Sequence, residues 1–227
     1  MRALSLTFAA ALLLAPLTAE ATISRAMKFD EKVENAAAIV VGKCIRQTSQ
    51  WDAARNWILT YSTFQVEKTL KGQPAQEITI VTPGGQVGDI AQDVVGVPRF
   101  RQGDENVLFV RNSNAGPTVL YLDQGAYRVV KDDRGNRMVN PLVSNAVLVD
   151  MQRGSAVAPE RPRPLREFEG NVRATIRHRE ALRMEMVERE KKQKASLWHQ
   201  VQRNKTLVFL ALIGAALATW QLMRRTS

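Results

Sequence analysis

The 227-residue sequence contains little cysteine and little histidine, and both scarcities exclude classes of chemistry. Cys44 is the single cysteine, so the chain cannot form an internal disulfide and its fold does not depend on oxidation. We expect Cys44 to be a small buried core residue; an intermolecular bridge or a reactive thiol is the alternative. The two histidines, His178 and His199, lie in the last quarter of the chain. The part before them therefore has no histidine for Ser-His-Asp or Cys-His catalysis, and no Cys/His set for zinc.

Most of the chain also lacks a net charge, although the formal net charge of the whole sequence is +10. Residues 3–160 hold 16 Lys+Arg and 16 Asp+Glu, so this part is neutral. Residues 161–205 hold 13 Lys+Arg against 6 Glu. A basic stretch of this kind contacts anionic lipid or nucleic acid, and beside an apolar segment the lipid is the expected partner. The neutral middle argues against nucleic acid as a partner.

Long apolar runs are rare, and the first of the two follows Arg2. At about 14 residues it has the length of a signal-peptide core and is too short to span a bilayer. Ala19-Glu20-Ala21 then places small residues where signal peptidase reads the chain. This order predicts a signal peptide over residues 1–21, cleaved before Thr22. Cleavage after Ala19 and an uncleaved signal anchor are the alternatives.

The second apolar run covers residues 206–223 and, at about 27 Å of helix, is long enough to cross a hydrocarbon core. We therefore predict one transmembrane helix there, followed by a short basic tail at 224–227; a buried soluble helix is the alternative. The residues expected at the membrane interface are Trp198, Lys205, Trp220, Arg224 and Arg225. Together with the signal peptide, this predicts a single-pass protein of the cytoplasmic membrane whose β domain lies on the exported side, periplasmic or extracellular. The basic residues before the helix conflict with that orientation, because positive flanks usually stay cytoplasmic.

Residues 27–150 carry short β-branched runs separated by glycine, proline and asparagine. This pattern is typical of strands and turns, so we predict a mainly β domain, a small OB-like barrel or a sandwich. The expected strands cover residues 38–45, 57–70, 78–81, 107–110, 119–122, 126–130 and 138–139. In the second of them, the residues expected on one face are Ile58, Thr60, Ser62, Phe64 and Val66. A short helix is expected over residues 29–37.

Four segments of this domain carry a resemblance: residues 38–42, 63–72, 80–85 and 100–109. In this order they look like a group of uncharacterised bacterial exported domains. Those domains are similar in layout to the netrin-like modules, OB-type barrels that include the tissue inhibitors of metalloproteinases. The resemblance covers residues 27–140 and implies an OB-type fold. Such inhibitors chelate the protease zinc through an N-terminal cysteine and hold their barrel with disulfides, so the single Cys44 leaves that mechanism unsupported.

The chain beyond the β domain changes composition twice. Residues 151–164 form a proline-rich linker, and residues 165–205 have the spacing of a basic amphipathic helical stalk. The apolar stripe of this stalk consists of Leu165, Phe168, Val172, Ile176, Leu182 and Met186. Either its first turns dock on the β domain and the rest is solvated, or the stripe forms a coiled coil or binds a partner.

Carboxylates are the remaining candidates for chemistry in the β domain. An enzyme or a calcium site would require convergence of Asp89, Asp93, Asp104 and Glu105. No EF-hand spacing accompanies them, which favours solvated loop charge. The glycines of residues 82–85 resemble those of a phosphate loop, but no Lys-Ser/Thr follows, which favours a turn.

These observations predict a non-enzymatic binding or interaction protein that is anchored in the membrane and presents its β domain at the cell envelope. The expected partners are a protein and, near the basic stalk, anionic lipid; a homo-oligomer through the stalk or the transmembrane helix is a further option. No cofactor and no metal are expected. The alternative is an envelope enzyme or enzyme accessory that uses the loop carboxylates, and an OB-type nucleic-acid binder ranks below it.

Overall fold

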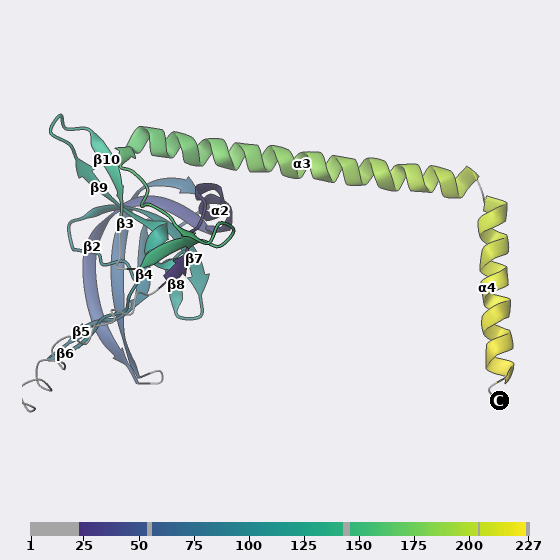
Figure 1. Ribbon diagram of the computed structural model, residues 1–227, viewed down its shortest axis with the longest axis horizontal. Coiled ribbons are helices and arrows are strands. Elements are labelled where there is room, and N and C mark those ends of the chain that lie inside the picture. The colour runs from purple at the N-terminus through teal and green to yellow at the C-terminus, as the bar shows by residue number, and fades with distance from the viewer. Residues whose placement is uncertain (1–22, 54–55, 143–145, 204, 226–227) are drawn as a thin grey trace, which may run out of the picture. The chain divides into compact units, whose positions relative to one another are not determined.

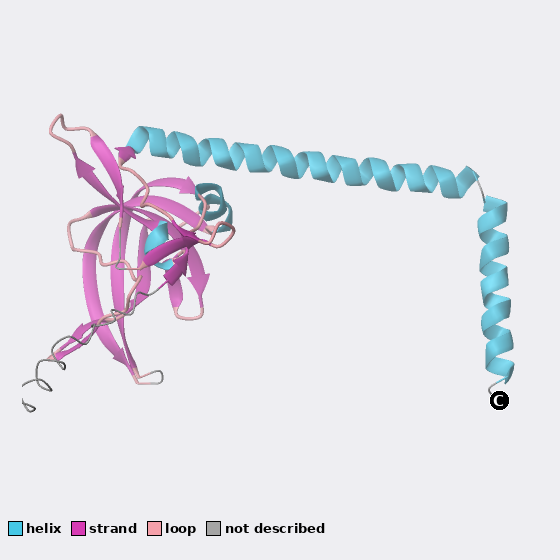
Figure 2. Cartoon of the chain, in the orientation of Figure 1, coloured by secondary structure: helices cyan, strands magenta, loops and turns pink. Residues whose placement is uncertain are grey.

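The computed structural model describes residues 23–53, 56–142, 146–203 and 205–225. The predicted signal peptide lies outside the described residues and stays a prediction. The described chain divides into two compact units, one that ends at Thr175 and one that begins at Ile176. Strands dominate the first unit, and helices form the second (Figure 1, Figure 2).

One eight-stranded antiparallel sheet is the frame of the first unit (Figure 1). Its strands are β2 (Ala38–Asp52), β3 (Trp57–Lys71), β4 (Glu77–Pro83), β7 (Glu105–Ser113), β8 (Gly116–Val119), β9 (Ala126–Lys131), β10 (Arg137–Pro141) and β13 (Arg163–Pro164). Their order across the sheet is β13-β10-β9-β7-β2-β3-β4, and β8 pairs with the last residues of β7. The long strands β2 and β3 form a hairpin whose two arms pair over nearly their full length.

Smaller elements surround this sheet. They are β1 (Ile23–Arg25), helix α2 (Phe29–Asn35), β5 (Gly85–Val87), β6 (Ile90–Gln92), the 3-10 turn η1 (Leu122–Gly125), β11 (Val147–Asp150) and β12 (Ser155–Ala156). β5 and β6 form a short hairpin, whereas β1, β11 and β12 form a separate three-stranded sheet in which β1 and β11 run parallel. Residues 147–156, between β10 and α3, are thereby tied to the start of the described chain.

Both faces of the large sheet are buried in its central strands. One core cluster, which contains Phe64 and Leu108, lies on one face. On the other face, Phe109 packs against Phe29 of α2 and Phe168.

On β3 the buried alternating residues are Ile58, Thr60, Ser62 and Phe64, as predicted, whereas Val66 is only partly buried. The register places Cys44 opposite Phe64, and the cysteine side chain is fully buried. Burial raises the pKa of its thiol. The predicted core role of Cys44 is confirmed.

The prediction of a small OB-like barrel or sandwich is wrong, since no barrel closes among the described strands, although the mainly β character is correct. The sheet curls until β4 and β8 approach each other: a Cβ on Gly116 would lie 3.4 Å from Val81 Cγ2. Among the described residues, however, no strand pairing joins β4 to β8 or to β13. β8 has only four residues, and Pro117 lacks the backbone N–H that another ladder would need. The sheet therefore stays open at this edge.

Helix α3 (Leu165–Arg203) begins in the first unit and continues into the second. Of its predicted apolar stripe, Leu165, Phe168 and Val172 are buried, Ile176 is partly exposed, and Leu182 and Met186 are exposed. The structure thus shows docking by the first turns of the helix on the β domain. A coiled coil or a partner for the remaining turns stays a prediction.

Helix α4 (Lys205–Arg225) contains the run for which we predicted a membrane span, residues 206–223. Among the described residues, no helix combines the length and the apolarity that crossing a membrane requires. In α4, residues such as Gly214, Thr219 and Gln221 interrupt the strongly apolar ones. The predicted transmembrane helix is therefore wrong. The membrane anchoring and the single-pass placement in the cytoplasmic membrane, with the β domain on the exported side, are wrong with it.

Candidate functional site

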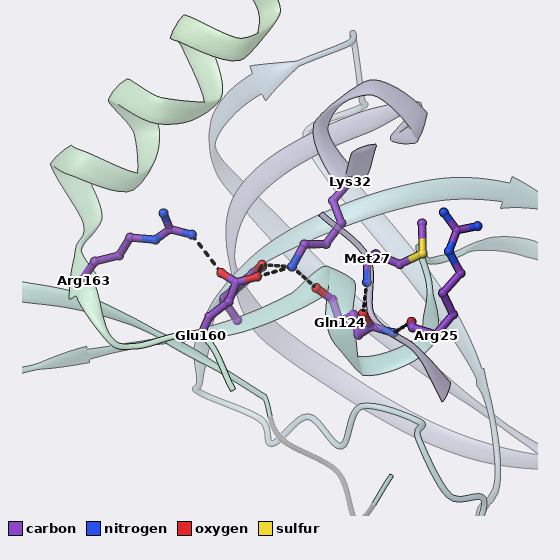
Figure 3. A network of polar contacts seen from close by, with 7 residues as sticks. Arg25, Met27, Lys32, Gln124, Glu160 and Arg163 are labelled. Carbon is purple, nitrogen blue, oxygen red and sulfur yellow. Dashed lines mark hydrogen bonds and ion pairs between the residues drawn. The ribbon is translucent and has the colours of Figure 1, made fainter. Parts of the chain in front are cut away.

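A lysine is buried in the first unit, on the side of α2 that faces the sheet. The Lys32 side chain is only 3% exposed. Its ammonium donates to Gln124 O (3.2 Å), to Tyr127 OH (2.6 Å) and to the Glu160 carboxylate (Figure 3). A lysine has three N–H donors, so all of them are used here.

Glu160 comes from residues 151–164, which we call the connector. Its Oε1 also accepts a hydrogen bond from Tyr127 OH (3.0 Å), and its Oε2 accepts one from Arg163 Nη2 (2.8 Å) (Figure 3). A buried ion pair persists only where the other donors and acceptors around it are satisfied. This arrangement meets that condition, and we call Lys32, Tyr127, Glu160 and Arg163 the lysine network.

Aromatic rings enclose the lysine network on the side of α3. The guanidinium carbon of Arg163 lies 4.7 Å from the ring centre of Phe29 and 4.8 Å from that of Phe168. Phe168 also meets Tyr127 edge to face, with ring centres 4.9 Å apart. Cation–π and edge-to-face contacts of this kind add to the gain from burying the rings. They hold α2, β9, the connector and the start of α3 together.

Burial sets the ionisation of both titratable groups at the centre of the network. It lowers the pKa of the Lys32 amine, and the neighbouring Glu160 carboxylate opposes part of that change. It also raises the pKa of the Tyr127 phenol well above its ordinary value, and Glu160 adds to this rise. The phenol keeps its proton at neutral pH and donates a hydrogen bond to Glu160.

A cavity of about 220 Å³ lies beside the lysine network, and we call it the connector pocket. Its apolar walls come from Met27, Leu142, Val147, Leu148, Val157 and Pro159, among others. The polar lining residues are Lys32, Asp123, Gln124, Tyr127 and Glu160. Because Lys32 and Glu160 pair with each other, an occupant of this pocket meets an apolar surface beside a charge pair that is already neutralised.

Gln124 ties the pocket to the first described residues. Its Oε1 accepts from Met27 N (2.9 Å), and its Nε2 donates to Arg25 O (2.9 Å) (Figure 3). The turn that precedes it has positive φ angles at Tyr121 (53°) and Leu122 (59°), which are uncommon for residues other than glycine. This turn explains why, of the strand predicted over 119–122, only Val119 lies in a strand, at the end of β8.

The four carboxylates considered for catalysis or calcium do not converge. Asp89 lies in the exposed turn between β5 and β6. The others take part in separate ion pairs, which join Asp93 to Arg99, Asp104 to Arg128 and Glu105 to Arg137. Over the described ranges, no group of three His, Cys, Asp or Glu side chains is arranged to hold a metal ion.

The five residues predicted for a membrane interface all belong to the second unit. Trp198 is exposed on α3, Lys205 and Arg225 are the first and last residues of α4, and the Arg224 guanidinium carbon lies 4.1 Å from the Trp220 ring centre. Since no described helix is apolar enough to span a membrane, this assignment loses its basis.

Sequence reasoning missed the lysine network, although one signal for Lys32 was present. In the expected helix, Phe29, Val33 and Ala36 define an apolar face by their helical spacing, and Lys32 falls on that same face. A lysine in such a position needs a buried partner. Nothing in the local sequence pointed to Glu160, which follows a proline in a stretch read as a linker.

No protein family model, no curated protein and no solved structure matches this chain. A functional interpretation consequently depends on the geometry of its own residues.

Proposed function

We propose that this chain is a non-enzymatic binding protein and that its connector pocket receives an apolar side chain of a partner protein. The observation that carries the proposal is a mainly apolar cavity whose charged lining residues, Lys32, Glu160 and Asp123, already interact within the protein. An occupant gains free energy by burying apolar surface and does not have to supply a counter-charge.

The size of the pocket favours a single side chain as the occupant. Sites for drug-sized ligands usually measure about 300–1,000 Å³. The connector pocket, at about 220 Å³, is smaller. Protein interfaces concentrate their binding energy in a few large side chains that fill such hollows. Val147 and Val157 line the pocket and are exposed, so they offer further apolar contact around an inserted side chain.

Two observations support binding over the other functions that the sequence suggested. The scattered carboxylates do not provide the paired acid and base that a hydrolytic enzyme needs. The neutral charge of residues 3–160 does not provide the phosphate contacts from which nucleic-acid binders gain affinity.

A direct test uses indole as a stand-in for an apolar side chain. The full chain, labelled with ¹³C at the methionine methyl groups, is titrated with indole and followed by NMR. We expect a saturable shift of the methyl signal of Met27, which lines the pocket, and no shift for Met151, which is exposed elsewhere. Equal shifts at both methyl groups, or none, would contradict the proposal.

A second test asks whether the same pocket captures a protein. Ala158→Trp places a large ring at the pocket lining, and Ala156→Trp places the same ring on an exposed connector residue that does not line it. Affinity capture with the full chain should recover a reproducible partner that Ala158→Trp loses and Ala156→Trp keeps. A partner set that is identical for both variants would contradict the proposal.

A further inference from the structure

A second hollow lies on the sheet face that carries Phe64, toward the turn between β2 and β3, and we call it the polar groove. Its volume is about 430 Å³, within the range of small-ligand sites. The register explains its position. Ser49 pairs with Thr60, and Thr60 pairs with Thr82, so three hydroxyl side chains share one face. Farther along that face, Phe64 and Ile80 belong to the apolar core.

The β5–β6 hairpin and the segment after it form the opposite wall of the groove. The backbone N–H of Ile58 donates to Gln92 Oε1 (2.6 Å), which fixes this wall to β3. Gly85 is required where the wall comes closest, because a Cβ there would lie 2.2 Å from Thr60 Oγ1 and 2.6 Å from Ser49 Oγ. Its φ of 134° is also one that L side chains rarely adopt. The chain thus brings the wall directly against the hydroxyl groups.

The lining consists mainly of neutral groups that both donate and accept hydrogen bonds. They belong to Gln47, Ser49, Thr60, Thr82, Gln86 and Gln92. The charged lining residues, Asp93 and Arg99, are exposed and form an ion pair with each other. Within the described residues, the Gln92 amide nitrogen donates no hydrogen bond, since only its oxygen is engaged. The hydroxyls of Ser49, Thr60 and Thr82 bond to one another or to backbone carbonyls. Each hydroxyl oxygen can still accept a further hydrogen bond, and together with the Gln92 amide this set matches an uncharged ligand rich in hydroxyl groups.

An exposed tryptophan, Trp51, lies on the same face two residues beyond the lining residue Ser49. It belongs to β2 and pairs with Ile58, whose side chain is buried on that face. The Trp51 residue is 42% exposed. A flat indole stacks on the C–H face of a pyranose ring, while the ring hydroxyls remain free to bind polar groups beside it.

We propose that the polar groove binds a neutral carbohydrate, with one pyranose ring stacked on Trp51 and its hydroxyls hydrogen-bonded to the groove lining. This site shares no lining residue with the connector pocket. It goes beyond the proposed function. Each of the two proposals can fail while the other stands.

The test is a titration of the full chain with three neutral trisaccharides: maltotriose, cellotriose and triacetylchitotriose. Binding is followed by tryptophan fluorescence and by NMR of the indole N–H signals. We expect saturable binding of at least one trisaccharide with a shift of the Trp51 signal. Trp51→Ala should weaken this binding by at least about tenfold.

The hairpin offers a matched control. Trp57 is 45% exposed, pairs with Asp52 and lies next to Ile58 on β3, so it faces the other side of the sheet. Trp57→Ala should leave the affinity unchanged, and Ser49→Ala should reduce it several-fold while the protein stays folded. Absence of binding for all three trisaccharides, or an equal loss for Trp51→Ala and Trp57→Ala, would overturn the proposal.

Discussion

The connector pocket and the polar groove are two cavities in one β-rich unit, and they differ in the charge and the hydrogen-bond partners of their polar lining groups. Beside the connector pocket, Lys32 and Glu160 are charged, but each finds its partners within the protein. In the polar groove, the lining groups are mostly neutral. The hydroxyls of Ser49, Thr60 and Thr82 bond within the protein but keep acceptor capacity, and the Gln92 amide nitrogen keeps donor capacity for a ligand. The comparison teaches that the chemistry of a hollow depends on which of its groups are already paired, more than on how many polar residues line it.

The largest effect expected is the loss of stability in Glu160→Ala, because this change leaves the Lys32 amine buried without its carboxylate. Removal of one partner from a buried ion pair costs about 3–5 kcal/mol. The Glu160 side chain is 33% exposed, so solvent screening reduces the expected loss. We expect a decrease of about 2–3 kcal/mol in the free energy of unfolding, measured with urea.

Glu167→Ala is the control for that measurement, because Glu167 is an exposed carboxylate in the first turn of α3. Its effect should stay within about 0.5 kcal/mol. Similar losses in both variants would show that the buried lysine does not depend on Glu160, and the contrast between the two hollows would fail.

A smaller effect is expected from Gly85→Ala in the polar groove. The new methyl group would meet Thr60 Oγ1, and the backbone would have to keep an unfavourable positive φ. We expect a loss of about 1–3 kcal/mol in urea unfolding, together with weaker trisaccharide binding. Gly88→Ala, in the open turn of the same hairpin, has no atom within 4 Å of the added methyl. It should cost about 1 kcal/mol or less and leave binding intact.

The smallest effect expected is a difference in alkaline stability between the protein and Tyr127→Phe. An unfolded chain releases its tyrosine proton near pH 10, whereas the folded protein keeps the Tyr127 proton to higher pH. Stability therefore falls as pH rises above about 10, by at most about 1.4 kcal/mol per pH unit from this group.

The Lys32 amine acts in the opposite direction, but in a lower pH range. Because the pKa of Lys32 is lowered in the folded protein, the unfolded chain holds this proton to higher pH than the folded protein does. The contribution of Lys32 to the free energy of unfolding therefore rises with pH up to about 10.4 and is constant above that. Above this pH, Tyr127→Phe should show the shallower decline in urea or thermal unfolding. Parallel declines would contradict the raised pKa of Tyr127.

Much of the central hairpin could be predicted from the sequence, because alternation is a local property. The face that carries Ile58, Thr60, Ser62 and Phe64 follows from a period of two residues and requires no knowledge of the partner strand. The open edge could not be predicted in this way. Whether β4 joins β8 depends on the curl of the whole sheet and on the short strand that contains Pro117.

The candidate sites were harder to predict from the sequence than the fold was. Lys32 and Glu160 are 128 residues apart, and no local pattern reports on a contact of that separation. The prolines of the connector indicated a linker, yet they flank residues that pack against Phe29 and Phe168. For the polar groove, the sequence identified the correct face of β3. It did not show that the β5–β6 hairpin covers this face and turns part of it into a cavity.

The most direct test of the contrast between the two hollows is a single NMR experiment on the full chain, titrated in parallel with indole and with maltotriose, cellotriose or triacetylchitotriose. The signals to follow are the Met27 methyl group in the connector pocket and the Trp51 indole N–H at the polar groove. Our account predicts that indole shifts Met27 and leaves Trp51 unchanged, whereas a trisaccharide shifts Trp51 and leaves Met27 unchanged. Shifts of both signals by the same compound, or of neither signal by any compound, would contradict it.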